Sequence, residues 1–282
     1  MSDGQGLVAW FGPVYAGQVP EATVPGWDRV FFPCTGDGKP PCGAYAESWT
    51  DATGQRVPRA LQAMKRPGAK ELALGAFSAG GQIVKRLLMH PTDRAAVRVA
   101  ALADALYVTD RDASGRPVPP EGFVLYGREA AVDPSKLLLL TVSSSPNKNY
   151  PSGSETLVPL VQAVASGSGQ EAVELSPGDP AYAALRAHVP PWVKGYRVGQ
   201  GAFFFDYGST VKHGEHATKL ASPFWQHLVV PYLAAGAAVP TTQPSTQVPP
   251  QDATTSAVGH FVAVSAGAYI AFCIAQWALR RR

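Results

Sequence analysis

The stretch with the clearest potential for chemistry surrounds Ser78. An apolar run ends at this serine, three small residues follow it, and an amphipathic pattern begins at once. A chain that passes from a strand directly into a helix places the residue between them at the tip of a tight turn. A serine held there can act as a nucleophile if a base removes its proton. The alternative is an ordinary strand–helix connection that contains a serine.

The residues around Ser78 resemble the nucleophile elbow of the α/β-hydrolases. That motif is G-x-S-x-G. This chain has Ala76 where the motif has its first glycine, and Gly80 is the second glycine. Small residues are needed because the strand and the helix pack closely on either side of the turn. In such a turn the helix N-terminus points at the reacting carbonyl, and the amide of Ala79 is expected to donate to an oxyanion.

A serine nucleophile needs a base, and the base needs an orienting acid. In the α/β-hydrolases the histidine lies in the loop after the last strand, which here predicts the segment that follows the apolar run 201–208. His213 and His216 both lie in that segment. We favour His213, because it precedes the final predicted helix. His216, expected in the first turn of that helix, is the alternative base.

Asp104 and Glu155 are the two candidates for the acid. Asp104 closes the apolar run 97–104, and a buried carboxylate in that place needs a partner. Some α/β-hydrolases carry their acid after this strand. The more usual place is one strand later, where the chain offers only Glu155, in a context typical of a helix capping box. We favour Asp104.

The remaining parts of the site are expected in loops. The chain has no HGGG-type oxyanion loop, so the second oxyanion donor is predicted near Phe11 or Gly12. The long loops 34–53 and 109–134 are expected to form a substrate pocket, with Tyr107 and Tyr150 as candidate lining residues. This chemistry needs no metal or organic cofactor, and no spacing of cysteines and histidines suggests zinc.

A wider resemblance covers about residues 7–235. The succession FSAGG, ADALY and YPSGSET, followed by two late histidines, is similar to a group of uncharacterised bacterial α/β-hydrolases. The resemblance implies a serine hydrolase fold with Ser78, Asp104 and a late histidine in catalysis, but no particular substrate. We expect hydrolysis of a carboxylic ester, or of an amide. Two alternatives are a non-catalytic binding module and an acyltransferase that uses the same triad.

Short apolar runs alternate with helical patterns through residues 1–238. Continuously apolar strands between helices indicate a parallel sheet that is buried on both faces. We therefore expect a three-layer α/β domain with a mostly parallel sheet. The predicted strands are 6–12, 28–34, 71–78, 97–104, 136–144 and 201–208, and the predicted helices are 59–66, 80–90, 154–165 and 220–235.

The C-terminal residues have a different composition. Residues 239–256 are rich in Pro, Thr and Gln and indicate an extended linker. Residues 257–279 contain no Asp, Glu, Lys or Arg and are long enough to span a bilayer. Three arginines follow, so residues 257–282 are predicted to form a membrane anchor. The positive-inside rule places the arginines in the cytoplasm, whereas tail-anchored insertion would give the opposite orientation.

Charge and cysteine content restrict the function further. The formal net charge is +3, and Arg280–Arg282 account for all of it. No basic face for nucleic acid is therefore expected. The N-terminus has no pattern of a cleavable signal peptide. Cys34 and Cys42 are close enough in sequence to form a disulfide, and two free thiols fit the sequence equally well.

Overall fold

The computed structural model describes residues 6–13, 24–34, 41–42, 44–45, 69–106, 108, 110–145, 151–179 and 182–236. Within them the chain has an α/β fold built on one eight-stranded, mostly parallel sheet in the order β2-β1-β3-β4-β5-β8-β7-β6. The strands are β1 (Gly6–Gly12), β2 (Trp27–Pro33), β3 (Glu71–Phe77), β4 (Val97–Ala103), β5 (Leu137–Val142), β6 (Ala172–Glu174), β7 (Lys194–Val198) and β8 (Ala202–Asp206).

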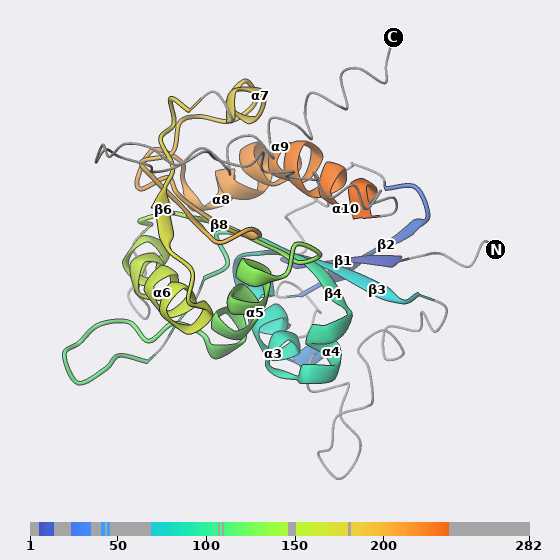
Figure 1. Ribbon diagram of the computed structural model, residues 1–282, viewed down its shortest axis with the longest axis horizontal. Coiled ribbons are helices and arrows are strands. Elements are labelled where there is room, and N and C mark those ends of the chain that lie inside the picture. Colours follow the sequence, from blue (N-terminus) through green and yellow to red (C-terminus); the bar gives the residue numbers. More distant parts are fainter. Residues whose placement is uncertain are drawn as a thin grey trace, which may run out of the picture.

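Helices cover both faces of the sheet, which gives three layers (Figure 1). One face carries α3 (Gly81–Met89), α4 (Pro91–Ala96), α5 (Glu121–Val132) and α6 (Gly153–Ser168). The other carries a continuous helical segment made of α8 (His213–Glu215), η4 (His216–Ala221), α9 (Ser222–Phe224), η5 (Trp225–Val229) and α10 (Val230–Gly236). The short α7 (Ala183–Arg186) packs against η5.

The sheet is buried on both faces because successive side chains of its strands enter two separate cores. In β1, Leu7 and Phe11 face the core under α3, α5 and α6, while Trp10 faces the core under the His213–Gly236 segment. Trp10 also explains Gly75 in the neighbouring strand, since a Cβ on Gly75 would collide with the indole ring. Alternation between two apolar layers produces the continuous apolar strands seen in the sequence.

The structure adds elements that the sequence did not predict. Residues 109–134, expected to be a long loop, contain the helix α5. Strand β7 pairs antiparallel with both β6 and β8, so this edge of the sheet departs from the parallel arrangement. The last helix begins at His213, earlier than the predicted residue 220. The predicted helix 59–66, the linker 239–256 and the apolar run 257–279 lie outside the described residues.

Cys34 and Cys42 form a disulfide at the carboxyl end of β2. The bridge ties residues 41–42 to this end of the sheet, and the Tyr45 hydroxyl donates a hydrogen bond to the Pro33 carbonyl at 2.6 Å. The Cys34 amide donates to the Gly12 carbonyl at 2.9 Å. The disulfide therefore lies beside the end of β1.

We expect replacement of Cys34 and Cys42 with serine to lower the free energy of unfolding by about 2–3 kcal/mol, because a cross-link over a short loop restricts the unfolded chain. Urea denaturation of both proteins measures the difference. Wild-type protein treated with dithiothreitol in the unfolded state should lose the same amount. An unchanged urea midpoint in both experiments would show that the bridge contributes nothing to stability.

Among the described helices, none is both long and apolar enough to cross a bilayer.

Candidate active site

Ser78 lies on a tight turn between β3 and α3. The turn is a single 3₁₀ stretch, Ser78–Gly80, and the backbone φ of Ser78 is +54°. A positive φ is costly for a residue with a Cβ, and such strain concentrates at functional sites. The close packing that imposes the turn is visible at Gly80, where a Cβ would collide with the carbonyl oxygen of Phe11. At Gly81 a Cβ would collide with the carbonyl oxygen of Ala105.

His213 lies at the start of α8 and hydrogen-bonds Ser78. Its Nε2 is 2.9 Å from the Ser78 Oγ, although 135 residues separate the two in the sequence. The Phe77 ring stacks on the imidazole, with centroids 4.9 Å apart and planes at 27°, and so fixes the plane of the histidine. About a third of the His213 side chain is exposed, at 34%. The base candidate is therefore held firmly while one side of it stays open to solvent.

Asp104 completes a linear chain of hydrogen bonds. Its Oδ2 lies 2.7 Å from the Nδ1 of His213. An ionised carboxylate only accepts hydrogen bonds, so the proton on a neutral His213 lies on Nδ1. That leaves Nε2 as the acceptor for the Ser78 hydroxyl. The three side chains are thus arranged so that the imidazole can take a proton from the serine.

Asp104 also occupies an unusual backbone position. It follows β4 directly with φ +42°, and among the described residues Ser78 and Asp104 are the two non-glycine residues with positive φ. The Asp104 amide donates to the Thr141 carbonyl at 2.8 Å, which anchors the turn to β5. The two strained positions in the described part of the chain are therefore two residues whose side chains hydrogen-bond His213.

Ser143 also holds the carboxylate of Asp104 and shares Oδ2 with the histidine. Its amide donates to Oδ1 at 2.9 Å and its hydroxyl to Oδ2 at 2.6 Å. Burial raises the pKa of Asp104, but the hydrogen bonds from His213 and Ser143, with the charge of either neighbouring histidine when protonated, bring the net pKa below its ordinary value. Asp104 is therefore ionised at neutral pH. The sequence did not point to Ser143, because a serine in a polar loop is not distinctive.

The N-terminus of α6 packs against the same carboxylate. A Cβ on Gly153, the first residue of this helix, would lie 3.3 Å from Asp104 Oδ1. The positive end of a helix dipole favours a negative charge at this place. The absence of a side chain at Gly153 lets the helix approach, so α6 adds to the stabilisation of ionised Asp104.

Glu155 is part of the capping box at the start of that helix, with Ser152 as the N-cap residue, and the geometry does not support it as the acid. Its Oε2 accepts hydrogen bonds from the Ser152 amide at 2.7 Å and from the Ser152 hydroxyl at 2.9 Å, and the reciprocal bond completes a capping box. Arg111 lies 3.7 Å from its other oxygen. The backbone hydrogen bond from Ser152 lowers the pKa of Glu155. The capping interpretation is confirmed, and the alternative acid is corrected, because this carboxylate is committed to the helix start.

The side chain of His216 points toward Thr141 and not toward Ser78, so the structure does not support His216 as the alternative base. It is fully buried, and its Nδ1 lies 3.0 Å from the Thr141 hydroxyl. Its Nε2 makes no close hydrogen bond. His213 is partly exposed at the helix start, whereas His216, one turn later, faces the sheet. The sequence favours His213 because it is expected before the last helix, but in the structure the helix begins at His213, and the two histidines differ in the direction of their side chains.

The two predicted oxyanion donors lie at the same edge of the sheet as Ser78. Ala79 is the next residue of the turn, and Gly12 is the last residue of β1. A Cβ on Gly12 would lie 3.7 Å from the Phe77 carbonyl oxygen, so the end of β1 is close to the turn. The two predicted pocket residues, Tyr107 and Tyr150, lie outside the described residues.

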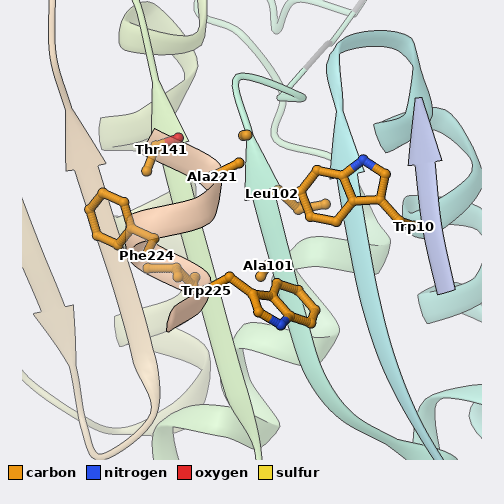
Figure 2. Close-up of a pocket in the computed structure, with 9 residues that line it drawn as sticks. Trp10, Ala101, Leu102, Thr141, Ala221, Phe224 and Trp225 are labelled. Atoms are coloured by element: carbon orange, nitrogen blue, oxygen red, sulfur yellow. The ribbon is translucent and has the colours of Figure 1, made fainter. Parts of the chain in front are cut away.

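A small apolar cavity lies behind the site, between the sheet and the His213–Gly236 segment (Figure 2). Its walls include Thr141 and the indole rings of Trp10 and Trp225, which meet edge to face with centroids 5.8 Å apart. It has room for about one water molecule. This volume is too small for a substrate, so the cavity is a feature of the core.

The strain at Ser78 predicts a difference in stability between two variants. We expect the free energy of unfolding of Ser78→Gly to exceed that of Ser78→Ala by about 1 kcal/mol, because glycine adopts a positive φ without steric cost. Urea denaturation of the two variants measures this difference. Both variants lack the hydroxyl, so the comparison isolates the Cβ. An alanine variant as stable as the glycine variant would show that the turn stores no strain.

Within the described residues no cluster of three or more histidine, cysteine or acidic side chains has the geometry of a metal site. Comparisons with protein-family models, with curated proteins and with solved structures gave no match. The chemistry of the site is therefore inferred from the geometry of Ser78, His213 and Asp104.

Proposed function

We propose that the protein is a serine hydrolase of the α/β-hydrolase type that cleaves a carboxylic ester, or an amide, through an acyl-enzyme intermediate. One observation carries the proposal: the unbroken chain of hydrogen bonds from Asp104 through His213 to Ser78. The order of these residues along the chain, and their positions after β3, after β4 and after β8, agree with the resemblance in sequence.

The reaction follows from the roles of the three side chains. Ser78 Oγ attacks the substrate carbonyl carbon while its proton passes to His213 Nε2. The tetrahedral intermediate collapses, the bond to the leaving group breaks, and His213 gives that proton to the leaving alkoxide or amine. Water then attacks the acyl-enzyme with His213 again as the base, which releases the acid and restores the Ser78 hydroxyl.

Two groups stabilise the charges that form on the way. Asp104 holds the Nδ1–H of His213 and balances the positive charge of the imidazolium. The amides of Ala79 and Gly12 are the proposed donors to the oxyanion, which gains the most from hydrogen bonds fixed in advance. Neither role requires a metal or an organic cofactor.

Hydrolysis of p-nitrophenyl acetate and p-nitrophenyl butyrate tests the proposal. We expect turnover by the wild-type protein, with p-nitrophenol and the free carboxylic acid as products. Product analysis in the presence of an added alcohol separates hydrolysis from acyl transfer, because a transferase makes the new ester in preference to the acid. No turnover of any activated ester would favour the non-catalytic binding module.

We also propose that residues 257–282 anchor the domain in a membrane with the domain on the outer side. A disulfide is typical of an oxidising compartment, and this agrees with the positive-inside orientation of Arg280–Arg282. Carbonate extraction of membranes tests the anchor. The full chain should stay in the pellet, and Gly267→Arg, which places a charge in the middle of the apolar run, should move to the supernatant.

Protease added outside intact cells tests the orientation. The domain should be cleaved when the protease is outside, while a cytoplasmic marker protein stays intact. Protection of the domain until the membrane is broken would reverse the proposed sidedness.

A further inference from the structure

His216 is a buried imidazole that the proposed reaction does not use. It lies three residues after His213 in the same helical segment, and its relative exposure is 0%. Its Nδ1 contacts the Thr141 hydroxyl at 3.0 Å. Its Nε2 makes no close hydrogen bond, although the Val211 backbone interacts with the imidazole. A buried imidazole needs hydrogen-bond partners to offset its loss of hydration, and the Thr141 hydroxyl supplies one of them.

Thr141 connects His216 to the acid of the site. Its hydroxyl contacts His216, and its carbonyl oxygen accepts the hydrogen bond from the Asp104 amide. The segment that begins with His213 and the turn that carries Asp104 are therefore both attached to the same residue of β5. The His213–Asp104 hydrogen bond joins these two attached segments.

The surroundings of His216 favour its neutral form. Burial lowers the pKa of His216, and the positive charge of a protonated His213 lowers it too, while the carboxylates of Asp104 and Asp206 and the Val211 carbonyl act in the opposite direction. The net pKa lies below the ordinary value, so the side chain is uncharged at neutral pH. A neutral imidazole has one N–H donor and one acceptor nitrogen, and the tautomer decides whether Nδ1 donates to the Thr141 hydroxyl or accepts from it. The Tyr207 ring stands perpendicular to it, with centroids 5.7 Å apart.

We propose that His216 is a positioning residue which, through its hydrogen bond to Thr141, sets the position of His213 against Asp104. The proposal rests on the function proposed above. His216 touches no reacting atom. Its effect on the reaction passes through the His213–Asp104 hydrogen bond alone.

Two substitutions of Thr141 test this proposal with little change in volume. Thr141→Val removes the hydroxyl and keeps the shape, whereas Thr141→Ser keeps the hydroxyl. We expect Thr141→Val to lower kcat about tenfold or more, since small misplacements of a catalytic group are costly, with KM within about twofold of wild type. The acidic limb of its pH–kcat/KM profile should move to lower pH, because the base loses part of its support from Asp104. Thr141→Ser should recover most of the loss.

A double-mutant cycle and a remote control separate positioning from general destabilisation. His216→Leu should cost about as much kcat as Thr141→Val, and the double variant no more than either one, because both remove the same hydrogen bond. Val164→Ala, buried in the other core, should lower stability without moving the pH profile. Losses that add in the double variant, or a Thr141→Val profile identical to wild type, would overturn the proposal.

A readout without substrate distinguishes failure of this proposal from failure of the proposed function. The Nδ1 proton of His213, bonded to Asp104, should give a low-field proton resonance that shifts or broadens in Thr141→Val and returns in Thr141→Ser. If wild type and Ser78→Ala hydrolyse esters equally, the proposed function fails, and this resonance alone decides the positioning role. If turnover depends on Ser78 but neither kcat nor the resonance responds to Thr141→Val, only the positioning role fails.

Discussion

Ser78→Ala is expected to hydrolyse activated esters at least about a thousandfold more slowly than the wild-type protein. The substitution removes the attacking oxygen, so only binding and the oxyanion donors still act on the substrate, and their combined effect is far below that of the complete triad. The Cβ and the backbone of the turn are retained. Thermal unfolding should therefore occur within a few degrees of wild type, which steady-state kinetics and circular dichroism together establish.

Ser166→Ala is the matched control, because Ser166 is exposed on α6, away from the turn. We expect it to keep full activity. If Ser78→Ala retained wild-type kcat with an activated ester, the nucleophile would lie elsewhere and the proposed function would be wrong. A loss of activity together with a loss of folded structure is resolved by Ser78→Gly, which fits the backbone conformation and should be folded and inactive.

Asp104→Asn is the second large effect, and we expect a fall in kcat of about 10⁴-fold. The amide group is the same size as the carboxylate, but it carries no negative charge and replaces one acceptor oxygen with an NH₂ donor. The imidazole of His213 then loses the interaction that keeps its proton on Nδ1. It also loses the charge that stabilises the imidazolium. The substitution Asp112→Asn, at an exposed turn, should have no effect on kcat.

The difference in stability between the wild-type protein and Asp104→Asn should depend on pH in a direction that the pKa of Asp104 fixes. The pKa of folded Asp104 lies below its ordinary value of 3.8. The ionised group therefore contributes stability above that value, and the contribution is lost as the pH falls through the folded pKa. Below about pH 4 the wild-type protein should lose stability relative to Asp104→Asn. Urea denaturation between pH 6 and pH 3 measures this, and a constant difference would contradict the lowered pKa.

The main sheet could be predicted from the sequence because its strands are buried on both faces. The runs around β3, β4, β5 and β8 are continuously apolar and end within about two residues of the observed bounds. Strand β6 has only three residues, all exposed, and leaves no hydrophobic pattern. Helix α5 was missed because the polar stretch before it made the whole segment resemble a loop.

For the candidate site too, some residues could be predicted from the sequence and others only from the structure. Ser78 and Asp104 end apolar strands, and their positions in the chain carried the prediction. The choice between His213 and His216 depends on the direction that each side chain takes from one helix, and no sequence pattern records this. Ser143 and the N-terminus of α6 reach Asp104 because β4 and β5 are neighbours, which is a property of the sheet.

The most direct measurement of the central claim is the site of reaction with a fluorophosphonate. Only an activated hydroxyl displaces fluoride from phosphorus, so the probe reports the serine and its base together. After a short incubation, mass spectrometry of peptides from the wild-type protein should show one phosphonyl group, attached to Ser78. Asp104→Asn should show little or none in the same time. A folded wild-type protein that stays unlabelled, or carries the label on another residue, would contradict the account.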